Sequence, residues 1–244
     1  MPFQIFSGIY QTFQDIPEQD EPFESDRWLT SAKGRLEKAC QEGSVCEEYG
    51  LPLLAATSVE KGAVCILDFG GGVGTLFPLV RDVLPQETEL DYHVIDNPPS
   101  CQAGREAHGE ESGIHFHETL PKQMDTVHIV HLGSVLQYVD DWKGLLKQLV
   151  AYQPRHLLFS DSMVGAMPTF ITVQDYYGKK IPFRFINQDE LSQFMQVELG
   201  YSLCYRSKYL QTVQGVKSFY DMDNLPAAFR VDCSYHLLYS KSTS

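Results

Sequence analysis

A run of closely spaced glycines constrains the fold of this 244-residue chain more than any other feature. The apolar segment 65–69 suits a buried strand, and an apolar helical pattern runs from Leu76 to Leu84. Between them lie four glycines, Gly70, Gly71, Gly72 and Gly74. A strand, a glycine turn and a helix in succession open a nucleotide-binding βαβ unit. Glycine is required there because the backbone bends sharply and approaches a ligand without an intervening Cβ.

Three ligand classes use such a turn, and the residues of this chain separate them. A phosphate-binding loop requires Gly-Lys-Ser or Gly-Lys-Thr, and neither tripeptide occurs in the chain. A dinucleotide fingerprint read from Gly70 requires glycine where the chain has Thr75. The remaining pattern is Asp-x-Gly-x-Gly-x-Gly, which begins at Asp68. The alternative, a glycine turn without a ligand, is disfavoured because each ordered glycine costs roughly 0.5–1 kcal/mol.

A second strand, predicted over residues 92–95, ends in Asp96 and is followed by Asn97. Asp96 lies 22 residues after Gly74, close to the spacing of about 20 residues at which an acid binds a ribose. A carboxylate at this place can accept hydrogen bonds from both ribose hydroxyls. Taken alone, Asp96 would read as a helix cap or a turn residue, and only the glycine turn at this spacing favours the ribose role.

The composition excludes several functions. A formal net charge of −13 argues against nucleic-acid binding, which requires a basic surface, and against anionic membranes. No segment has the length and apolarity of a membrane span, and the N-terminus lacks an export signal, so we expect a cytoplasmic protein. The six cysteines form no Cys-x-x-Cys pair, which fits a reducing compartment.

The hydrophobic pattern predicts an α/β fold with a Rossmann-like sheet. Five parallel strands are expected at residues 65–69, 92–95, 114–117, 126–132 and 156–160, and a C-terminal antiparallel pair at 201–209 and 234–240. We place this domain at residues 61–244. Residues 1–60 are predicted as an N-terminal helical cap, with an aromatic start, an acidic loop and a helix from about Ser25 that Gly43 would end. Such a segment covers either the active-site mouth or only a sheet edge.

Ligands of doubly wound sheets lie at the carboxyl ends of the strands, which places several side chains in the cleft. These are His131, Ser134, Gln137, Tyr138 and Asp161. His131 reads equally well as a core histidine with satisfied hydrogen bonds. Residues 162–180 lack clear periodicity and are predicted as an irregular substrate loop.

His115 and His117 fall on one face of a predicted strand and could bind a metal ion. No carboxylate or cysteine completes a metal pattern at a defined spacing. A surface strand face is the favoured interpretation, and no metal site is expected.

The motif from Asp68 to Gly74, together with Asp96, resembles motif I of the class I methyltransferases that use S-adenosylmethionine (SAM). The resemblance covers roughly residues 61–244 and implies SAM as the cofactor. It implies that Asp68 lies near the methionine amino group, and that the glycines let the nucleoside and the methionine end lie on the backbone. It further implies that Asp96 binds the ribose with Asn97 beside it, that Glu118 meets the adenine, and that Ser134 lines the cleft.

A narrower resemblance is to bacterial methyltransferases of unassigned activity that are associated with surface-polysaccharide genes. It rests on four segments: Gly8-Ile9-Tyr10, the glycine turn, Ile95-Asp96-Asn97-Pro98, and Ser134-Val135-Leu136-Gln137-Tyr138. The triple glycine and the Asp-x-Pro also resemble plant-type O-methyltransferases of small molecules. That family keeps a catalytic histidine after the fifth strand, where this chain has Ser160-Asp161-Ser162-Met163, so no base can be carried over.

These features predict a SAM-dependent methyltransferase that acts on a small molecule, at oxygen, on a sugar or a related metabolite. A base contributes about 10²–10⁴ in rate to such a reaction, and His131 and Asp161 are the candidates, with Tyr138 as a positioning group. The alternative is a non-catalytic SAM-binding or interaction module, because no base is assignable by motif. A nicotinamide dehydrogenase is disfavoured by Thr75 and by the antiparallel ending. The sequence does not indicate the oligomeric state.

Overall fold

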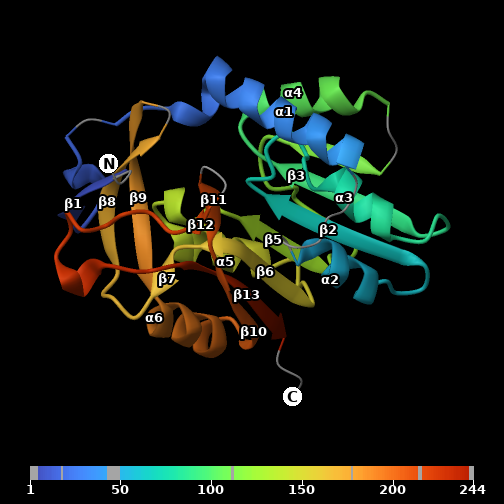
Figure 1. Cartoon of the computed structure of the whole chain (residues 1–244). Coiled ribbons are helices and arrows are strands. Elements are labelled where there is room, and N and C mark those ends of the chain that lie inside the picture. The colour runs from blue at the N-terminus through green and yellow to red at the C-terminus, as the bar shows by residue number, and fades with distance from the viewer. Residues whose placement is uncertain are drawn as a thin grey trace.

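A computed structural model gives the fold of this chain (Figure 1). It describes residues 5–17, 19–42, 50–110, 113–176, 178–213 and 216–241. Gly43, the predicted end of the first helix, lies outside these residues. Two sheets lie side by side, a seven-stranded sheet that carries the glycine turn and a four-stranded sheet near the N-terminus.

The large sheet has the strand order β10-β13-β6-β5-β2-β3-β4. Five of its strands are parallel: β2 (Ala63–Phe69), β3 (Glu89–Ile95), β4 (Ile114–His117), β5 (Ile129–Gly133) and β6 (His156–Ser162). The strands β10 (Tyr201–Tyr209) and β13 (Ser234–Lys241) form its antiparallel end. The prediction of a mostly parallel Rossmann-like sheet that ends in antiparallel strands is confirmed.

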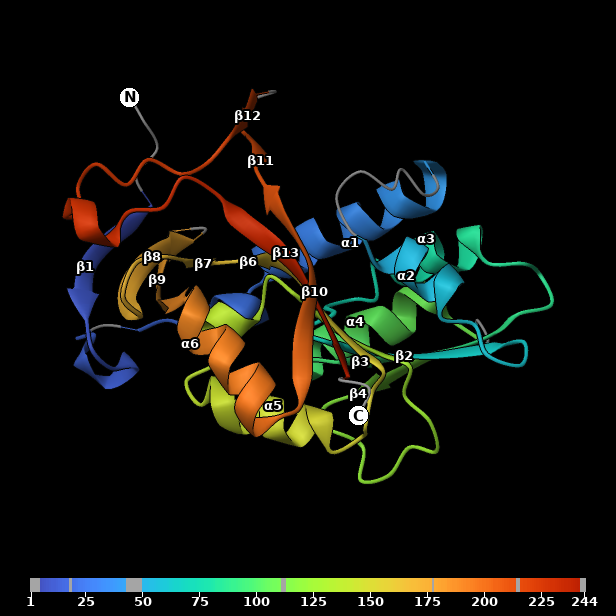
Figure 2. The ribbon, with the colours of Figure 1, turned by 90° about the horizontal axis from the view of Figure 1, so that it is seen from below.

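Helices cover both faces of this sheet, as Figure 2 shows from below. The helices are α1 (Asp26–Glu42), α2 (Leu51–Thr57), α3 (Phe77–Val83), α4 (Pro98–His108), α5 (Trp142–Val150) and α6 (Gln188–Gln193), which continues as a π-helix over Phe194–Glu198. Val64 and Ile66 pack with α2 and α3, whereas Leu67 packs with α5 and α6 on the opposite face. Successive side chains of β2 therefore enter two different cores, and its continuous apolar run follows from burial on both faces.

Two helices begin with a side-chain cap. Asp141 accepts a hydrogen bond from Gly144 N at 2.9 Å and begins α5. Asn187 accepts one from Glu190 N at 2.9 Å and begins α6. Each cap satisfies a backbone donor that has no partner inside the helix.

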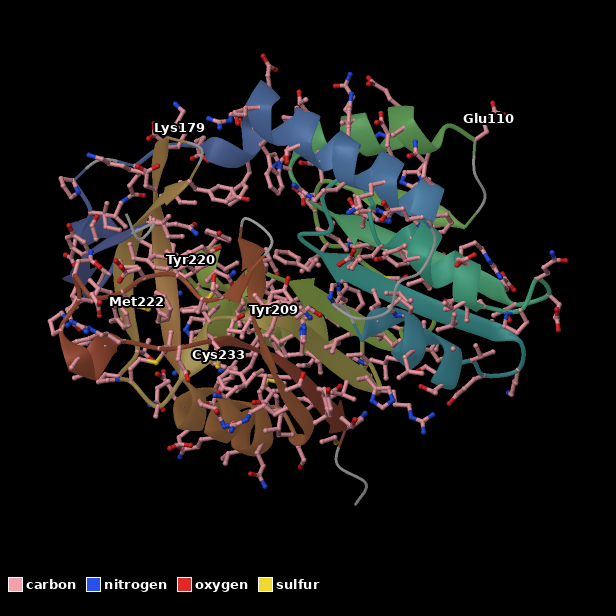
Figure 3. All side chains as sticks on the ribbon, viewed as in Figure 1. Glu110, Lys179, Tyr209, Tyr220, Met222 and Cys233 are labelled. Carbon is pink, nitrogen blue, oxygen red and sulfur yellow. The ribbon has the colours of Figure 1, made fainter. Side chains whose placement is uncertain are left out.

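The four-stranded sheet corrects the prediction of an irregular loop at residues 162–180. Its order is β1-β8-β9-β7, with bounds Phe6–Tyr10 for β1, Val164–Gly165 for β7, Phe170–Tyr176 for β8 and Lys179–Asn187 for β9. Residues 170–174 are all buried, including the polar Thr172 and Gln174, so burial does not alternate along the first five positions of β8. Apolar and polar residues do alternate over Ile171-Thr172-Val173-Gln174, but this run is short and stands between Pro168 and Gly178, two residues typical of loops. Lys179 stands at the tip of the β8–β9 hairpin (Figure 3) and pairs with Asp20 at 3.4 Å.

The N-terminal segment is not wholly helical. Its aromatic start forms β1, which pairs antiparallel with β8. Two short 3-10 helices, Phe13–Asp15 and Pro22–Glu24, lead into α1. The helix α1 then packs on the glycine turn, since Ala32 and Leu36 form one buried cluster with Val73 and Ala103.

The long connection between β10 and β13 covers the second sheet. It contains the small hairpin β11 (Gln211–Val213) and β12 (Val216–Ser218) and a 3-10 helix at Ala227–Phe229. Met222, labelled in Figure 3, and Leu225 pack against Phe6 and Phe183. Among the described residues no helix combines the length and the apolar character that crossing a membrane requires.

Candidate functional site

The glycine turn connects β2 to α3 at the carboxyl edge of the large sheet. Gly70, Gly72 and Gly74 have φ values of 74°, 61° and 76°. These lie in the left-handed region, which other L-residues adopt at a cost of roughly 1–2 kcal/mol each. Gly70 N also donates to Ile95 O at 2.8 Å, so the turn begins fixed to the end of β3.

A Cβ atom added to these glycines would meet different surroundings. At Gly70 it would lie 2.4 Å from Val135 Cγ2, and at Gly71 it would lie 2.5 Å from Asp68 Oδ2. Both positions therefore require glycine for internal packing. At Gly72 it would meet nothing within 4 Å, so the backbone there borders open space that a ligand can enter.

Asp68 lies beneath the turn at the centre of a buried polar network. Its Oδ1 is 2.7 Å from His131 Nδ1, and its Oδ2 accepts a hydrogen bond from Tyr92 Oη at 2.6 Å. His131 Nε2 in turn lies 3.0 Å from Ser160 Oγ. A carboxylate can only accept, so Nδ1 carries the hydrogen of the contact with Asp68, and Nε2 is paired with the Ser160 hydroxyl. Burial, and then the Asp68 charge, raises the pKa of Tyr92 well above its usual value and keeps it a donor.

This network bears on two predicted roles. Both carboxylate oxygens of Asp68 are engaged inside the protein, with the side chain beneath Gly71 rather than in open space. His131 is 1% exposed and both of its ring nitrogens have partners. The geometry is that of the core histidine which the sequence left open as an alternative.

Asp96 follows β3 and faces the turn from the neighbouring strand. Its Oδ2 accepts a hydrogen bond from Gly72 N at 2.8 Å, and its Oδ1 accepts one from Asn97 N at 2.7 Å. Each oxygen keeps a further lone pair for another donor. Burial raises the pKa of this carboxyl, an effect that the two backbone donors oppose. The structure thus brings Asp96 and Gly72 into direct contact, as their spacing in the sequence indicates.

Asn97 and Glu118 have partners within the protein. Asn97 is the N-cap of α4, with its Oδ1 accepting from Ser100 N at 2.9 Å, and its Nδ2 lies 3.4 Å from Phe23 O. Glu118 follows β4 and pairs with Arg105 of α4 at 3.2 Å, with half of its side chain exposed.

Ser134, which directly follows β5, and Asp161 near the end of β6 lie at the carboxyl ends of two neighbouring strands. Their φ values are 51° and 50°, a conformation that residues other than glycine rarely adopt and that is concentrated at functional sites. Ser134 Oγ accepts from Gln137 Nε2 at 2.9 Å. Asp161 is 7% exposed, and its Oδ1 accepts from Ser234 Oγ at 2.5 Å.

His236 on β13 is a residue of this edge that the sequence did not indicate. Its Nδ1 accepts a hydrogen bond from Asp161 N at 3.2 Å, so its hydrogen is on Nε2, which is buried without a hydrogen-bond partner. Burial, and then the charge of His131, lowers the pKa of His236 to about 4. The ring is therefore neutral at pH 7 and presents an N–H donor.

Tyr138 lies between the two sheets. Its hydroxyl donates to Gln174 Oε1 of β8 at 2.9 Å, and its ring packs at 4.9 Å from Phe23 and 5.3 Å from Phe183. Burial raises the pKa of Tyr138 well above its usual value, so the phenol donates hydrogen bonds and does not act as a base. Phe23 also contacts Trp28 at 5.4 Å, which extends this aromatic cluster into the N-terminal segment.

Two cavities lie elsewhere. One of about 860 Å³ is lined by residues 120–127, 148 and 151–153, which precede β5 and β6 and lie at their amino ends. The other, of about 550 Å³, is lined by residues 164–167, 227–228, 230–233 and 235. Neither is lined by the glycine turn or by Asp96, and ligands of such sheets bind at the carboxyl ends of the strands, so the glycine turn is the better candidate.

Ser160, Tyr92 and His236 were missed because their partners are distant in the chain. Tyr92 and Asp68 are separated by 24 residues, and His236 and Asp161 by 75. Within each segment these residues read as ordinary strand positions. Only strand pairing could have indicated them, since Asp68 and His131 are direct neighbours on β2 and β5.

Comparison with known proteins supports the fold. No protein-family model matches the chain, and no curated protein matches it. Similar solved structures include the complex between the Haloferax volcanii Trm112 methyltransferase activator and a proposed methyltransferase, with 17% identity, a TM-score of 0.56, and coverage of 89% of this chain and 95% of that chain. Magnesium protoporphyrin IX methyltransferase (ChlM) from Synechocystis PCC 6803, with bound S-adenosylhomocysteine (SAH), has 10% identity, a TM-score of 0.50, and coverage of 93% and 90%.

The LepI complex with SAM has 14% identity, a TM-score of 0.52 and coverage of 89% of this chain. The present chain spans about half of LepI, 53% of its length. At these identities the comparisons establish the fold. The fold is that of the SAM-dependent methyltransferases, and neighbours that share it have been solved with SAM or SAH bound.

Proposed function

We propose that this protein is a SAM-dependent methyltransferase that acts on a small molecule. The observation that carries the proposal is the pairing of Gly72 with Asp96. The one turn glycine that borders open space donates its backbone N–H to the acid expected to bind the ribose. The backbone of Gly72 and the carboxylate of Asp96 would then both contact the cofactor. Proteins of this fold have been solved with SAM or SAH bound.

The open space at Gly72 and the carboxylate of Asp96 are compatible with SAM binding. Gly70, Gly71, Gly72 and Gly74 would follow the cofactor along the backbone, with Asp96 accepting from its ribose hydroxyls. When bound, SAM supplies an activated methyl group, so the protein contributes alignment and a dry site. Asp68 would act from below by fixing the turn, since its oxygens are held by Tyr92 and His131. Asn97 would fix the start of α4 beside the ribose, and Glu118 would contact the adenine. Ser134 would line the cleft, where its backbone is held in a strained conformation.

For the acceptor we propose a hydroxyl group, on a sugar or a related metabolite of the kind found in surface polysaccharides. Asp161 is then the proposed group that takes the hydroxyl proton, because its carboxylate lies at the strand edge in a strained conformation. His131 would position Ser160 and Asp68, and Tyr138 would orient the acceptor beneath the aromatic cluster. The N-terminal segment 1–60, whose helix packs on the turn, would cover the cofactor bound by residues 61–244.

The test is a calorimetric titration with SAH of the parent chain and of Asp96→Ala. We expect a single site in the parent and at least about a tenfold loss of affinity in the variant, because each ribose hydrogen bond to a charged group is worth about 1.5–3 kcal/mol. Asp125→Ala, an exposed acid at the opposite edge of the sheet, is the matched control and should bind like the parent. Absence of SAH binding in the parent, or equal affinity in Asp96→Ala, would overturn the proposal.

The second candidate is a SAM-binding module without activity. It is favoured by one observation, that the polar atoms of His131 and Tyr138 and one oxygen of Asp161 already have partners inside the protein. The two candidates separate when SAM is incubated with pools of hydroxylated metabolites. SAH that accumulates only with an acceptor supports the enzyme, whereas tight SAH binding without turnover in any pool supports the module.

A further inference from the structure

Five side chains of the types that can ligate a metal ion lie on one face of β2, β3 and β4, away from the glycine turn. Cys65 on β2 is the direct neighbour of Asp91 on β3, and His93 is the direct neighbour of His115 on β4. His117 follows two positions later on the same face of β4. The sequence favoured an ordinary surface face for the two β4 histidines; in the fold, a carboxylate and a cysteine from the neighbouring strands lie on the same face.

The donor atoms of this group are close together. The thiol of Cys65, the carboxylate of Asp91 and one ring nitrogen of His93 all lie within 4.8 Å of one another. Asp91 Oδ1 is 2.9 Å from His93 Nε2 and 3.2 Å from His115 Nε2. A single carboxylate oxygen, Asp91 Oδ1, therefore faces the Nε2 atom of each of two imidazole rings.

The contact between His93 and Asp91 is not a hydrogen bond. His93 Nε2 is buried and has no hydrogen-bond partner, although Asp91 Oδ1 is only 2.9 Å away. On its other side, His93 Nδ1 lies 2.9 Å from His117 Nε2, a distance at which one ring donates to the other. When His93 is the donor of that bond, its Nε2 directs a lone pair toward the carboxylate, and a cation between the two atoms would satisfy both.

We propose that this group is a zinc site, with Cys65, Asp91, His93 and His115 as the ligands. Thiolate, imidazole and carboxylate donors are the set that Zn²⁺ takes in tetrahedral sites, with bonds of about 2.0–2.3 Å. Ligand atoms around such an ion are about 3.3–3.8 Å apart, so the widest separation in the group, up to 4.8 Å, contracts by about 1 Å, and the contacts of 2.9 and 3.2 Å lengthen slightly. The Cys65 thiol proton leaves to solvent when the sulfur binds the ion.

His117 holds the orientation of the His93 ring. The rings of His93 and His117 are nearly parallel, 5.1 Å apart and inclined by 21°, and their nitrogens are in hydrogen-bond contact. A ligating histidine in metal sites uses its second ring nitrogen in this way, which fixes both the tautomer and the ring plane. The His115 ring also lies close to His93, with its centroid 4.8 Å away and its plane inclined by 27°. Both rings restrain His93, whose Nε2 faces Asp91.

The surroundings let an ion enter. The connection from Glu118 to His128 contains no helix, so this face of β3 and β4 lacks the cover that helices give the rest of the sheet. Asp91 and His115 have about half of their side chains exposed, whereas Cys65 is buried. The strand β4 is the edge of the sheet, and an ion held by three strands would fix that edge. Because Cys65 and Asp68 point to opposite faces of β2, this site is separate from the cofactor site.

The experiment is a metal titration of the full chain after removal of bound metal with a chelator. We expect one Zn²⁺ per chain with a Kd below about 1 μM, and a Co²⁺ complex that shows thiolate-to-cobalt absorption. Zn²⁺ should also raise the Tm, since an ion that binds only the folded chain stabilises it. Absence of stoichiometric binding, or a Co²⁺ spectrum without the thiolate band, would overturn the proposal.

Three variants assign the ligands. Cys65→Ser should remove the thiolate band and weaken Zn²⁺ binding by at least about tenfold, whereas Cys204→Ser, an exposed cysteine on β10, should leave both unchanged. His115→Gln changes a half-exposed side chain and so tests the site without disturbing the core. Zn²⁺ binding of parent strength in both Cys65→Ser and His115→Gln would show that the ion binds elsewhere. Each readout is independent of SAM binding.

Discussion

The large sheet carries two polar clusters on opposite faces, and they differ in how completely they are satisfied. Beneath the glycine turn, Asp68 and His131 are each 1% exposed, and every side-chain polar atom of the pair has a partner. On the other face, Asp91 and His115 have about half of their side chains exposed, and a nitrogen of His93 has no hydrogen bond. The first cluster is closed, and the second is open to solvent.

The difference follows from what covers each face. Helices α2 and α3 cover one face at β2 and β3, so polar groups there must find partners inside the protein or cost about 1–3 kcal/mol each. No helix follows β4 on the other face, and groups there can exchange water for a metal ion. A closed cluster stabilises the turn above it, whereas an open one can bind a ligand. The predictions below test this distinction.

The largest expected effect is on stability, and it compares an acid from each cluster. Asp68→Ala leaves the Tyr92 hydroxyl and His131 Nδ1 without an acceptor, so we expect the free energy of unfolding to fall by about 4 kcal/mol. Asp91→Ala in metal-free protein should change it by less than about 1 kcal/mol, because water replaces the exposed carboxylate. Urea unfolding of both variants in a chelator measures the difference. Equal losses would show that the two clusters do not differ in this way.

The second prediction separates ligand approach from backbone strain at the glycine turn. Gly72→Val places a side chain in the open space, and we expect SAH affinity to fall by about 100-fold, or about 2.7 kcal/mol. Gly109→Val is the matched control, because Gly109 has a φ of 60° against 61° for Gly72 and also has open space around its Cβ position. Both variants should lose similar stability, since both force a β-branched residue into the left-handed region.

Calorimetry with SAH and urea unfolding together decide the outcome. A Gly109→Val variant that binds SAH as weakly as Gly72→Val would assign the loss to strain, and the open space above Gly72 would then not be the cofactor site. Parent-like SAH affinity in Gly72→Val would lead to the same conclusion.

The third prediction concerns the pH dependence of stability that arises from His236, a histidine outside the two clusters. The pKa of His236 is lowered from 6.5 to about 4 in the folded chain, so between these values the unfolded chain binds the proton and the folded chain does not. Its contribution to stability is therefore complete above pH 6.5 and is lost as the pH falls toward 4. The upper limit is about 3 kcal/mol, which partial solvent contact reduces to about 2 kcal/mol.

Urea unfolding at pH 7 and at pH 4.5 measures this loss in the parent and in His236→Asn. Asparagine can still accept from Asp161 N but does not titrate, so the variant should lose less stability between the two pH values. His117 and His156, whose pKa values are also lowered by burial, titrate in both proteins and cancel in the comparison. Identical pH dependence in the two proteins would contradict the assignment to His236.

Some parts of the fold could be predicted from the sequence alone and others could not. The glycine turn, Asp96 and the order of the strands were predictable because each is signalled within a few residues, by glycine spacing or by an apolar run. The strand β8 was not, because its alternation of apolar and polar residues extends over only four residues, Ile171-Thr172-Val173-Gln174, between loop-forming residues. Its pairing with β1 joins residues about 165 positions apart, as Phe6 and Gln174 do, and no local pattern records that.

Only part of the open cluster could be predicted from the sequence. The sequence placed His115 and His117 on one face of a single strand. Cys65 and Asp91 lie on two other strands, and their proximity depends on the strand pairing of the folded chain. Within their own segments a buried cysteine and a strand aspartate are unremarkable. Chemistry assembled across strands escapes a sequence argument unless the register is known, and the same holds for the contact of His131 with Ser160.

The smallest expected effect tests Glu118, which follows the edge strand β4. Glu118→Ala removes its pair with Arg105, both half exposed, and should change the free energy of unfolding by no more than about 1 kcal/mol. If Glu118 meets the adenine, SAH affinity falls a further few-fold by calorimetry. Arg105→Ala breaks the same pair but keeps the Glu118 carboxylate. This variant should therefore lose as much stability as Glu118→Ala while its SAH affinity stays at the parent value. Equal SAH affinity in both variants would remove Glu118 from the cofactor site and leave it as a surface partner of α4.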